Sequence, residues 1–375
     1  MKKKIYIVDY LGIHCGMHYY NSSFKNYIEE INGLDVEILS NYKEKGTPFF
    51  YNVFINNKLK SFLFLILNYF RLIFKIISSK NNIFIFLSYG NIIDVIIMTI
   101  TLFTKRVIID VHEVFALQLK NKYIHYLLSV LYRNSVNTVI FHSERSDELL
   151  NKIGYKNKRI YVPHFKYEFV KTFDFKEIGD DIIQTISKTE INILFFGNVS
   201  SVKGIDLLLS AINLLPENII NRINIIIAGK DSDGKVNTVQ CKNELSIKKV
   251  LRHISDDELV FLFTQIDYVI LPYRKTSQSG ILEMAFYFNK PIIATRLKYF
   301  ERILAKFPSF GILMQADEVS ISNSLIYVVN SHEKDYNTYF SNEDLLLYSQ
   351  KNDTDKFIKE FGEVINNVSL IKKHL

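Results

Sequence analysis

The stretch that decides the fold is Ile193–Leu215, which reads ILFFGNVSSVKGIDLLLSAINLL. Its apolar start is typical of a buried strand that ends at Gly197, and a polar loop then leads through Lys203 and Gly204 into a segment with helical apolar spacing. A glycine at the end of a strand lets a ligand approach the backbone, and the start of the next helix offers free N–H groups to a phosphate. Lys203 is placed to meet a diphosphate as a point charge. By itself, the pattern also occurs in ordinary strand-to-helix turns that carry a surface lysine.

A second stretch, Asp267–Thr295 (DYVILPYRKTSQSGILEMAFYFNKPIIAT), makes a ligand site the better interpretation. A predicted strand ends at Leu271, a polar loop follows, and Ser279-Gly280 opens a predicted helix. Gly280 leaves amides free for a phosphate, helped by the positive end of the helix dipole. Glu283, about one turn further on, can accept hydrogen bonds from both hydroxyls of a ribose. A capping or solvated glutamate is the alternative, but Met284-Ala285-Phe286 beside it reads as core.

Short apolar runs alternate with helix-length segments along the whole chain, which is the signature of parallel α/β sheets. A length of 375 residues exceeds the size at which a single core keeps growing, so we expect two α/β domains. The predicted parts are an N-terminal domain at residues 1–165, a connection at 166–190, a C-terminal domain at 191–340 and helices at 341–375. The predicted strands are Ile5–Val8, Val36–Leu39, Ile83–Leu87, Val107–Asp110, Val139–Phe141, Ile160–Val162, Ile191–Phe196, Ile223–Ala228, Tyr268–Leu271 and Ile292–Ala294, and the predicted terminal helices are Glu343–Gln350 and Asp355–Asn366.

Composition narrows the class of protein. A hydrophobic content of 48% and an aromatic content of 14% exclude a disordered or low-complexity chain. The two cysteines, Cys15 and Cys241, lie far apart and predict neither a disulfide framework nor a metal site. The apolar run near the start ends at Asp9 with no small-residue cleavage site after it. It therefore reads as a first strand rather than a signal peptide, and we expect a cytoplasmic protein.

Positive charge is concentrated in the first half of the chain. Residues 1–165 carry 21 Lys and Arg against 12 Asp and Glu, a net charge of +9, whereas residues 166–375 carry 25 against 27, a net charge of −2. Such asymmetry indicates an anionic partner, either nucleic acid or a membrane surface. Because no nucleic-acid-binding module is recognisable, we expect no nucleic acid partner and favour the membrane.

The segment Ser61–Ile77, SFLFLILNYFRLIFKII, is similar to a membrane span but falls short of one. A span needs about 20 apolar residues with few charges. On a helix, the polar residues of this segment form one narrow stripe beside a wide apolar surface. Two interpretations stay open, a helix on a bilayer and a helix buried between the sheet and its neighbours. In the first, which the basic first half favours, the residues that meet lipid phosphates are Lys58, Lys60, Arg71 and Lys75.

The two glycine-containing stretches together resemble the retaining glycosyltransferases of the GT-B fold, in particular family 4. The C-terminal domain of that family carries a glycine loop with Lys-Gly, then two glutamates eight positions apart, and ends in a helix-to-strand passage of Ala, Gly, Pro and Ile. The matching residues here are Gly197, Lys203-Gly204, Glu283-Met-Ala and Lys290-Pro-Ile-Ile-Ala. The resemblance covers about residues 190–330. It implies two Rossmann-like domains that face each other across a cleft, a donor site on the second domain, and C-terminal helices that return to the first.

The sequence departs from the family pattern at two positions. Asn198 stands where the family often has an arginine, and Lys275 stands where the first of the paired glutamates would fall. The loop instead fits a related subgroup with Gln-Ser-Gly, so Lys203 is expected to neutralise the diphosphate together with Arg274 or Lys275. The donor-binding residues that the resemblance implies are Gly197, Lys203, Arg274, Lys275, Gln278, Ser279, Gly280, Ile281 and Glu283.

In the first half of the chain the resemblance implies two further elements. The loop after the first strand, which contains Gly12, Gly16 and His18, is similar to the flexible loop that lines the acceptor side. Val107–Glu113, VIIDVHE, is similar to a strand end that faces the donor sugar. His112 is therefore the candidate catalytic residue, which would bond a sugar hydroxyl or share the charge that develops at the reacting centre. A structural role is the alternative for both histidines.

The resemblance implies transfer of a sugar from a nucleotide diphosphate to an acceptor hydroxyl, with retention at the anomeric carbon and without a cofactor. Asp231-Ser-Asp233 has the spacing of a metal-binding motif but lies in a predicted turn, so no metal is expected. The expected partners are a nucleotide-sugar donor and a lipid-linked or oligosaccharide acceptor of surface polysaccharide or glycolipid assembly, at the inner face of the cell membrane. One alternative is a non-catalytic subunit that binds nucleotide sugar or glycan, which Lys275 favours. The other is a sugar-nucleotide epimerase, for which we find no cluster of acid–base carboxylates.

Overall fold

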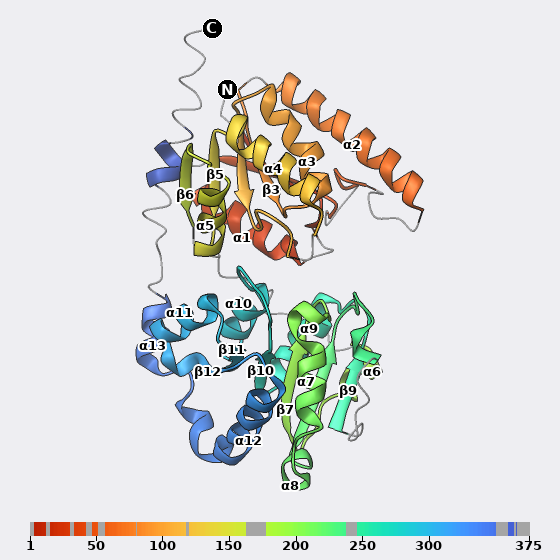
Figure 1. Ribbon diagram of the computed structural model, residues 1–375, viewed down its shortest axis with the longest axis vertical. Coiled ribbons are helices and arrows are strands. Elements are labelled where there is room, and N and C mark those ends of the chain that lie inside the picture. The colour runs from red at the N-terminus through yellow and green to blue at the C-terminus, as the bar shows by residue number, and fades with distance from the viewer. Residues whose placement is uncertain are drawn as a thin grey trace. The chain divides into compact units, whose positions relative to one another are not determined.

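Two parallel sheets of six strands each organise the chain (Figure 1). Unit 1 comprises Met1–Tyr167 and Asn352–Leu375, and unit 2 comprises Glu168–Lys351. The computed structural model describes residues 4–12, 16–30, 34–42, 47–51, 57–79, 81–117, 120–162, 178–237, 246–349, 359–363 and 365. Helices connect successive strands in both units, which confirms the predicted α/β class and its Rossmann-like domains.

The sheet of unit 1 has the strand order β2-β1-β3-β4-β5-β6. Runs of Ile, Val and Phe form its strands because β-branched and aromatic side chains suit a parallel sheet that is covered on both faces. The strands are β1 Lys4–Asp9, β2 Asp35–Ser40, β3 Ile83–Ser88, β4 Val107–Val111, β5 Thr138–Phe141 and β6 Lys158–Tyr161. The helices are α1 Met17–Glu30, α2 Lys58–Ser78, α3 Ile92–Met98, the 3-10 helix η2 Thr99–Leu102, α4 Lys122–Asn134 and α5 Glu144–Lys152.

The sheet of unit 2 has the order β12-β11-β10-β7-β8-β9. Its strands are β7 Ile191–Phe196, β8 Ile223–Ala228, β9 Ile247–Val250, β10 Tyr268–Leu271, β11 Ile292–Thr295 and β12 Gly311–Met314. Its α-helices are α6 Asp180–Ile183, α7 Ile205–Ile212, α8 Glu217–Ile220, α9 Asp256–Gln265, α10 Gly280–Tyr287, α11 Lys298–Lys306, α12 Glu318–Asp335 and α13 Asn342–Ser349. Its 3-10 helices are η4 Ser201–Lys203, η5 Lys235–Asn237, η7 Pro308–Phe310 and η8 Tyr336–Thr338.

All ten predicted strands form, and the structure contains two further strands, β9 and β12, that the sequence did not predict. Both missed strands lie at the edges of the sheet in unit 2, where only one side of the strand pairs with another strand among the described residues. β9 reads IKKV with both lysines exposed, and β12 reads GILM with one fully buried residue. β9 carries no continuous apolar run and the run of β12 is only three residues long, so neither pattern separates the strand from a loop.

The end of the chain returns to unit 1. The helical residues 359–363 and 365, at the blue end of the colour scale, belong to that unit (Figure 1). Phe361 is fully buried and its ring centroid lies 6.4 Å from that of Phe24 in α1. Glu363 forms an ion pair with Lys158 at 3.8 Å. The predicted return of the C-terminal helices to the N-terminal domain is therefore present in this segment, but it is wrong for the first of the two helices, because α13 belongs to unit 2.

Each sheet has one point at which the strand order reverses. In unit 1 the chain passes from β1 outward to β2 and then to β3 on the other side of β1. In unit 2 it passes from β7 through β8 and β9 and then to β10 on the other side of β7. Ligands of open α/β sheets bind beyond the carboxyl ends of the strands at such a reversal. Two candidate regions follow, the loops after β1 and β3 and the loops after β7 and β10.

Candidate functional site

The loops after β7, β8 and β10 are packed backbone against backbone. Gly204 has a φ of 77°, and a Cβ atom there would lie 1.8 Å from the carbonyl oxygen of Pro272. Gly229, after β8, has a φ of 137°, and its Cβ would lie 1.8 Å from the carbonyl oxygen of Gly197. Only glycine fits both positions, because an added Cβ would overlap a backbone oxygen. Gly204, which the sequence predicted as part of the site, thus brings together the loops of the strand reversal in unit 2, and Gly229, which it did not predict, adds the β8 loop.

Lys203 and Arg274 have different surroundings within these loops. The ammonium of Lys203 lies 3.7 Å from the centre of the Tyr273 ring, a cation–π contact that fixes the charge beside the end of β10. Arg274 makes a two-pronged ion pair with Asp206, with N···O distances of 2.6 and 2.8 Å, and also donates to the Ser201 carbonyl at 2.6 Å. Arg274 thus joins the β10 loop to α7, and its predicted role toward a phosphate stays a prediction.

The start of α10 carries the predicted acidic residue. Ser279 caps the helix by accepting a hydrogen bond from the amide of Leu282 at 3.3 Å. Glu283 is 1% exposed, and its Oε2 accepts a hydrogen bond from the Tyr348 hydroxyl at 2.7 Å. Glu283 is therefore a buried carboxylate near a helix N-terminus, which excludes the solvated-residue interpretation.

The other predicted donor residues lie around α10. Ile281 faces the first loop, since a Cβ on Gly197 would lie 3.2 Å from its Cδ1. Lys275 is exposed, and Gln278 and Gly280 are half-buried. The carbonyl of Gln278 accepts a hydrogen bond from the Thr276 hydroxyl at 2.5 Å. All nine predicted donor residues thus lie in the loops after β7 and β10 and the first turn of α10.

The Asp231-Ser-Asp233 segment forms a turn, as predicted. Asp231 Oδ1 accepts a hydrogen bond from the Gly234 amide at 2.8 Å. Asp233 Oδ2 accepts from the amide and the hydroxyl of Ser201 at 2.8 and 2.7 Å. Asp231 thus closes the turn within the β8 loop, and Asp233 holds that loop to the Lys203 loop.

In unit 1 the loops after β1 and β3 share a network of buried groups. Asp9 accepts hydrogen bonds from the Gly12 amide at 3.0 Å, the Asn21 side chain at 2.6 Å and the Tyr89 hydroxyl at 2.7 Å. Gly12 has a φ of 45°. Asp9 therefore fixes the start of the predicted acceptor-side loop, of which residues 13–15 lie outside the described residues.

The other two predicted members of that loop differ. Gly16 has a φ of 67° and no atom within 4 Å of the Cβ that it lacks. His18, at the start of α1, is half-buried, with its ring centroid 3.9 Å from that of Tyr19 and 5.5 Å from that of Tyr42. The acceptor-side role of both residues stays a prediction.

His112 belongs to a buried cluster at the carboxyl ends of β4 and β5. Its Nε2 lies 3.6 Å from Asp110 Oδ2, and its ring stacks on Tyr89 at 5.6 Å and meets the Tyr20 ring edge-on at 4.5 Å. The second carboxylate oxygen, Asp110 Oδ1, lies 2.6 Å from His142 Nε2. The sequence thus predicted His112 but not the acid and the second histidine beside it.

His142 has an acceptor at each ring nitrogen. Its Nδ1 lies 2.9 Å from the Val162 carbonyl, and its Nε2 faces the Asp110 carboxylate. Burial alone would raise the pKa of Asp110, but the neighbouring His142 and His112 hold it well below its usual range. Tyr20 adds a hydrogen bond to Asp110 Oδ2 at 2.7 Å. The carboxylate is therefore ionised and surrounded by donors.

Burial lowers the pKa of His112, and this effect outweighs the opposite effect of Asp110. The imidazole is therefore neutral at neutral pH. A neutral imidazole can act as a hydrogen-bond donor or acceptor toward a sugar hydroxyl, or take up a proton. These properties suit the catalytic role of His112, which stays a prediction.

Asp110, His112 and His142 could also hold a metal ion, because one ligand atom from each lies within 4.8 Å of the others. The Nδ1 bond of His142 to a backbone carbonyl is typical of metal-binding histidines. However, the 2.6 Å contact between His142 Nε2 and Asp110 Oδ1 is a direct hydrogen bond. A metal ion would have to replace the proton of that bond.

Comparison with known proteins agrees with this geometry. Residues 180–339 match the family described as Glycosyl transferases group 1. No curated protein sequence matches the chain. Sucrose-phosphate synthase from Thermosynechococcus elongatus has a TM-score of 0.73 at 11% identity, over 98% of this chain and 99% of that one. HepE of Anabaena, in complex with UDP and glucose, has a TM-score of 0.65 at 14% identity, over 97% and 100%. WaaG, a glycosyltransferase involved in lipopolysaccharide biosynthesis, has a TM-score of 0.65 at 11% identity, over 96% and 99%.

The two sheets, their loop sites and the structural matches define the GT-B fold. Unit 2 carries the glycosyltransferase group 1 domain, in which all nine predicted donor residues lie. The chain is accordingly a glycosyltransferase of the GT-B fold.

Proposed function

We propose that this glycosyltransferase moves a sugar from a nucleoside diphosphate to an acceptor hydroxyl with retention at the anomeric carbon. The bond between the anomeric carbon and the diphosphate oxygen breaks, and the acceptor oxygen bonds to the same carbon and gives up its proton. The nucleoside diphosphate leaves with the electron pair of the broken bond.

The observation that carries this proposal is the buried Glu283 at the start of α10, beside loops that only glycines allow to meet. Glu283 would accept the ribose hydroxyls. The free amides at the α10 N-terminus and the ammonium of Lys203 would stabilise the charge that develops on the departing diphosphate. His112 keeps its proposed role toward the sugar or the reacting centre.

The acceptor that we propose is a lipid-linked or oligosaccharide hydroxyl of surface polysaccharide or glycolipid assembly, at the cytoplasmic face of a membrane. The basic first half of the chain supports this choice. We further propose that turnover needs no metal ion, because Lys203 and the helix amides supply the positive charge. Sugar transfer that survives EDTA supports this, and transfer that stops with EDTA and returns with Mg²⁺ or Zn²⁺ contradicts it.

The first experiment is the melting temperature of the purified protein with UDP, GDP, ADP and CMP. UDP is the first choice because HepE was solved with it. A ligand at 100 times its dissociation constant stabilises the folded state by about 2.7 kcal/mol, a readable shift. We expect a shift with one nucleotide that is lost in Glu283→Gln, which keeps the side-chain size.

Glu343→Gln is the matched control, because Glu343 is an exposed glutamate of α13 in the same unit. A shift that survives Glu283→Gln, or none with any nucleotide, contradicts the donor site. Release of free nucleotide with acceptor then separates the transferase from the binding subunit, and the anomeric configuration of the product decides retention.

A further inference from the structure

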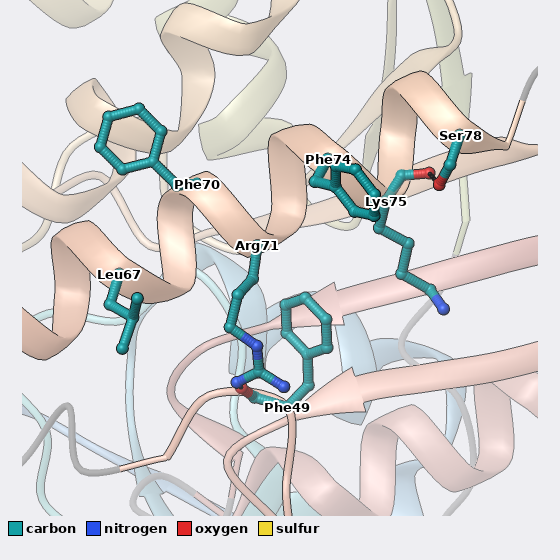
Figure 2. A pocket seen from close by; sticks show the side chains of 7 residues that line it. All are labelled: Phe49, Leu67, Phe70, Arg71, Phe74, Lys75 and Ser78. Carbon is teal, nitrogen blue, oxygen red and sulfur yellow. Dashed lines mark hydrogen bonds between the residues drawn. The ribbon is translucent and has the colours of Figure 1, made fainter.

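Helix α2 turns its polar stripe toward the body of unit 1. Asn68 is fully buried and donates to the Tyr51 carbonyl at 3.0 Å. Arg71 donates to the Phe49 carbonyl at 2.8 Å, with its guanidinium 4.8 Å from the centre of the Phe49 ring. Lys75 lies over the Tyr6 ring at 4.5 Å. Figure 2 shows Arg71 reaching from the helix toward Phe49. Two of the four basic residues expected to meet lipid phosphates are thus engaged with the protein.

The opposite side of α2 is apolar and exposed. Seven large apolar side chains on it are between 45% and 74% exposed: Leu59, Phe62, Leu63, Leu67, Phe70, Phe74 and Ile77. The interpretation of α2 as a helix buried on all sides is therefore wrong. A shallow groove of about 480 Å³ lies beside this face, between Phe49 and the helix, and is lined also by Leu67, Phe70, Arg71, Phe74, Lys75 and Ser78 (Figure 2).

An exposed apolar stripe of this length is costly in water. Full burial of an exposed Leu, Ile or Phe side chain contributes about 1.5–3 kcal/mol. These side chains are between 45% and 74% exposed, so each would gain about half to three quarters of that. Single exposed apolar residues are ordinary on protein surfaces, whereas a contiguous row marks an interaction site. The row on α2 therefore requires a partner that is apolar along the whole helix.

We propose that α2 lies in the surface of an anionic lipid bilayer, with its exposed apolar side chains inserted among the acyl chains. This does not depend on sugar transfer, because it rests on the burial pattern of one helix. Lys60, at the edge of the exposed face, would meet the lipid phosphates, and the net charge of +9 on residues 1–165 would attract the unit to the surface.

The helix lies on the membrane rather than across it. Leu59–Ser78 is long and apolar enough to cross a membrane by length and composition, with 22% of its apolar window buried. However, Asn68, Leu72 and Ile76 are buried against unit 1, and Arg106 donates to the Ile76 carbonyl at 2.7 Å. These contacts hold the inner side of the helix to the protein, so only the outer side can enter lipid.

A second copy of the chain is the less favourable occupant. Two copies that met through α2 would bring together two halves of charge +9. Like charges at an interface oppose association, whereas an anionic bilayer is complementary to them.

The test is sedimentation with vesicles of phosphatidylethanolamine and phosphatidylglycerol at 3:1. We expect the wild-type protein to sediment with them. The variant Phe70→Glu/Phe74→Glu is expected to lose at least about 10-fold in its partition coefficient. Both side chains are more than 60% exposed, so the fold should survive. The matched control is Leu214→Glu/Val319→Glu, which adds the same charge at exposed apolar positions of unit 2.

A second readout uses the absence of tryptophan from the chain. In Phe74→Trp the single indole should shift its emission to the blue when these vesicles are added, and in Leu214→Trp it should not. Partition that is equal in wild type and Phe70→Glu/Phe74→Glu, or an unshifted Phe74→Trp spectrum, overturns the proposal. The proposal is also overturned if the wild-type protein is a dimer, the double variant is a monomer, and neither protein sediments with the vesicles. The nucleotide-induced melting shift should be unchanged in the double variant, so failure here is distinct from failure of the donor site.

Discussion

The hydroxyl of Tyr348 lies 2.7 Å from Oε2 of Glu283, although the two residues are 65 positions apart. Tyr348 belongs to α13, and its ring packs edge-on against Phe286 at 5.6 Å and Phe307 at 5.4 Å. The aromatic contacts fix the position of the hydroxyl, and the hydroxyl in turn orients the carboxylate. Tyr348 is therefore a positioning residue for the proposed donor site.

The variant Tyr348→Phe keeps the ring and removes only the hydroxyl. We expect the dissociation constant of the preferred nucleotide to rise about 3- to 10-fold, because a hydrogen bond to a charged group contributes about 1.5–3 kcal/mol and part of it serves orientation. Isothermal titration calorimetry measures the change. Tyr327→Phe is the control, since Tyr327 lies on α12 with its hydroxyl 3.4 Å from Asp335. Unchanged nucleotide affinity with lowered stability would make the bond purely structural.

Gly204 provides a test of the close approach between the two donor loops. In Gly204→Ala the new methyl group would overlap the Pro272 carbonyl oxygen, in a backbone conformation that L-residues avoid. We expect the free energy of unfolding to fall by about 3 kcal/mol, from strain and overpacking together, and nucleotide binding to weaken. Urea denaturation measures the first effect.

The control for that variant is Gly234→Ala, because Gly234 has a similar φ of 70° but no atom within 4 Å of its missing Cβ. Its free energy of unfolding should fall only by the cost of placing alanine in a left-handed backbone conformation, about 1–2 kcal/mol. Equal losses in the two variants would show that the approach to Pro272 is not tight.

The sequence predicted the central strands and the glycine loops because both leave local patterns. Strands such as β7 and β8 are buried on both faces, and Gly204 stands in the left-handed conformation directly before α7, where a glycine is the usual residue. The bonds of Tyr348 with Glu283 and of Asp110 with His142 join distant segments, so their partners follow from topology and leave no local pattern.

The sequence pattern also did not predict which side of α2 faces the protein. A helical pattern shows that Asn68, Arg71 and Lys75 share one side, but it does not show which side meets the protein. The carbonyls of Phe49 and Tyr51 decide it, because they need donors and the polar stripe supplies them. Without that loop, the rule that apolar sides face inward gives the wrong orientation.

Lys203 should act on the diphosphate and not on the nucleoside. In Lys203→Met we expect the affinity for the nucleoside diphosphate to fall about 10-fold, while that for the nucleoside monophosphate falls much less, because the ammonium would lie beside the terminal phosphate. Calorimetry with both ligands measures the difference. Lys188→Met, at an exposed lysine of the same unit, is the control. An equal loss for both ligands would place Lys203 near the base or ribose instead.

His112 should make stability depend on pH in a defined range. Burial lowers its pKa in the folded state, whereas the unfolded value is about 6.5. Between the two values the unfolded state binds more protons, so stability rises with pH and falls as the pH drops below about 6.5. The free energy of unfolding of the wild-type protein should decrease between pH 7.5 and pH 5.5. We expect this decrease to be smaller in His112→Gln by up to about 1 kcal/mol. Urea denaturation at both pH values measures it.

The comparison must be between proteins at each pH, because a second buried group titrates nearby. Burial raises the pKa of Asp94 to about 6. The contribution of Asp94 therefore makes the folded protein less stable as the pH rises, which is opposite in sign to the contribution of His112. The effect of Asp94 is the same in wild type and His112→Gln, so it cancels in the difference. His253→Gln, at an exposed histidine, should leave the pH dependence as in wild type. If His112→Gln also keeps the full decrease, burial does not lower the pKa of His112, and the argument from burial for a neutral imidazole is wrong.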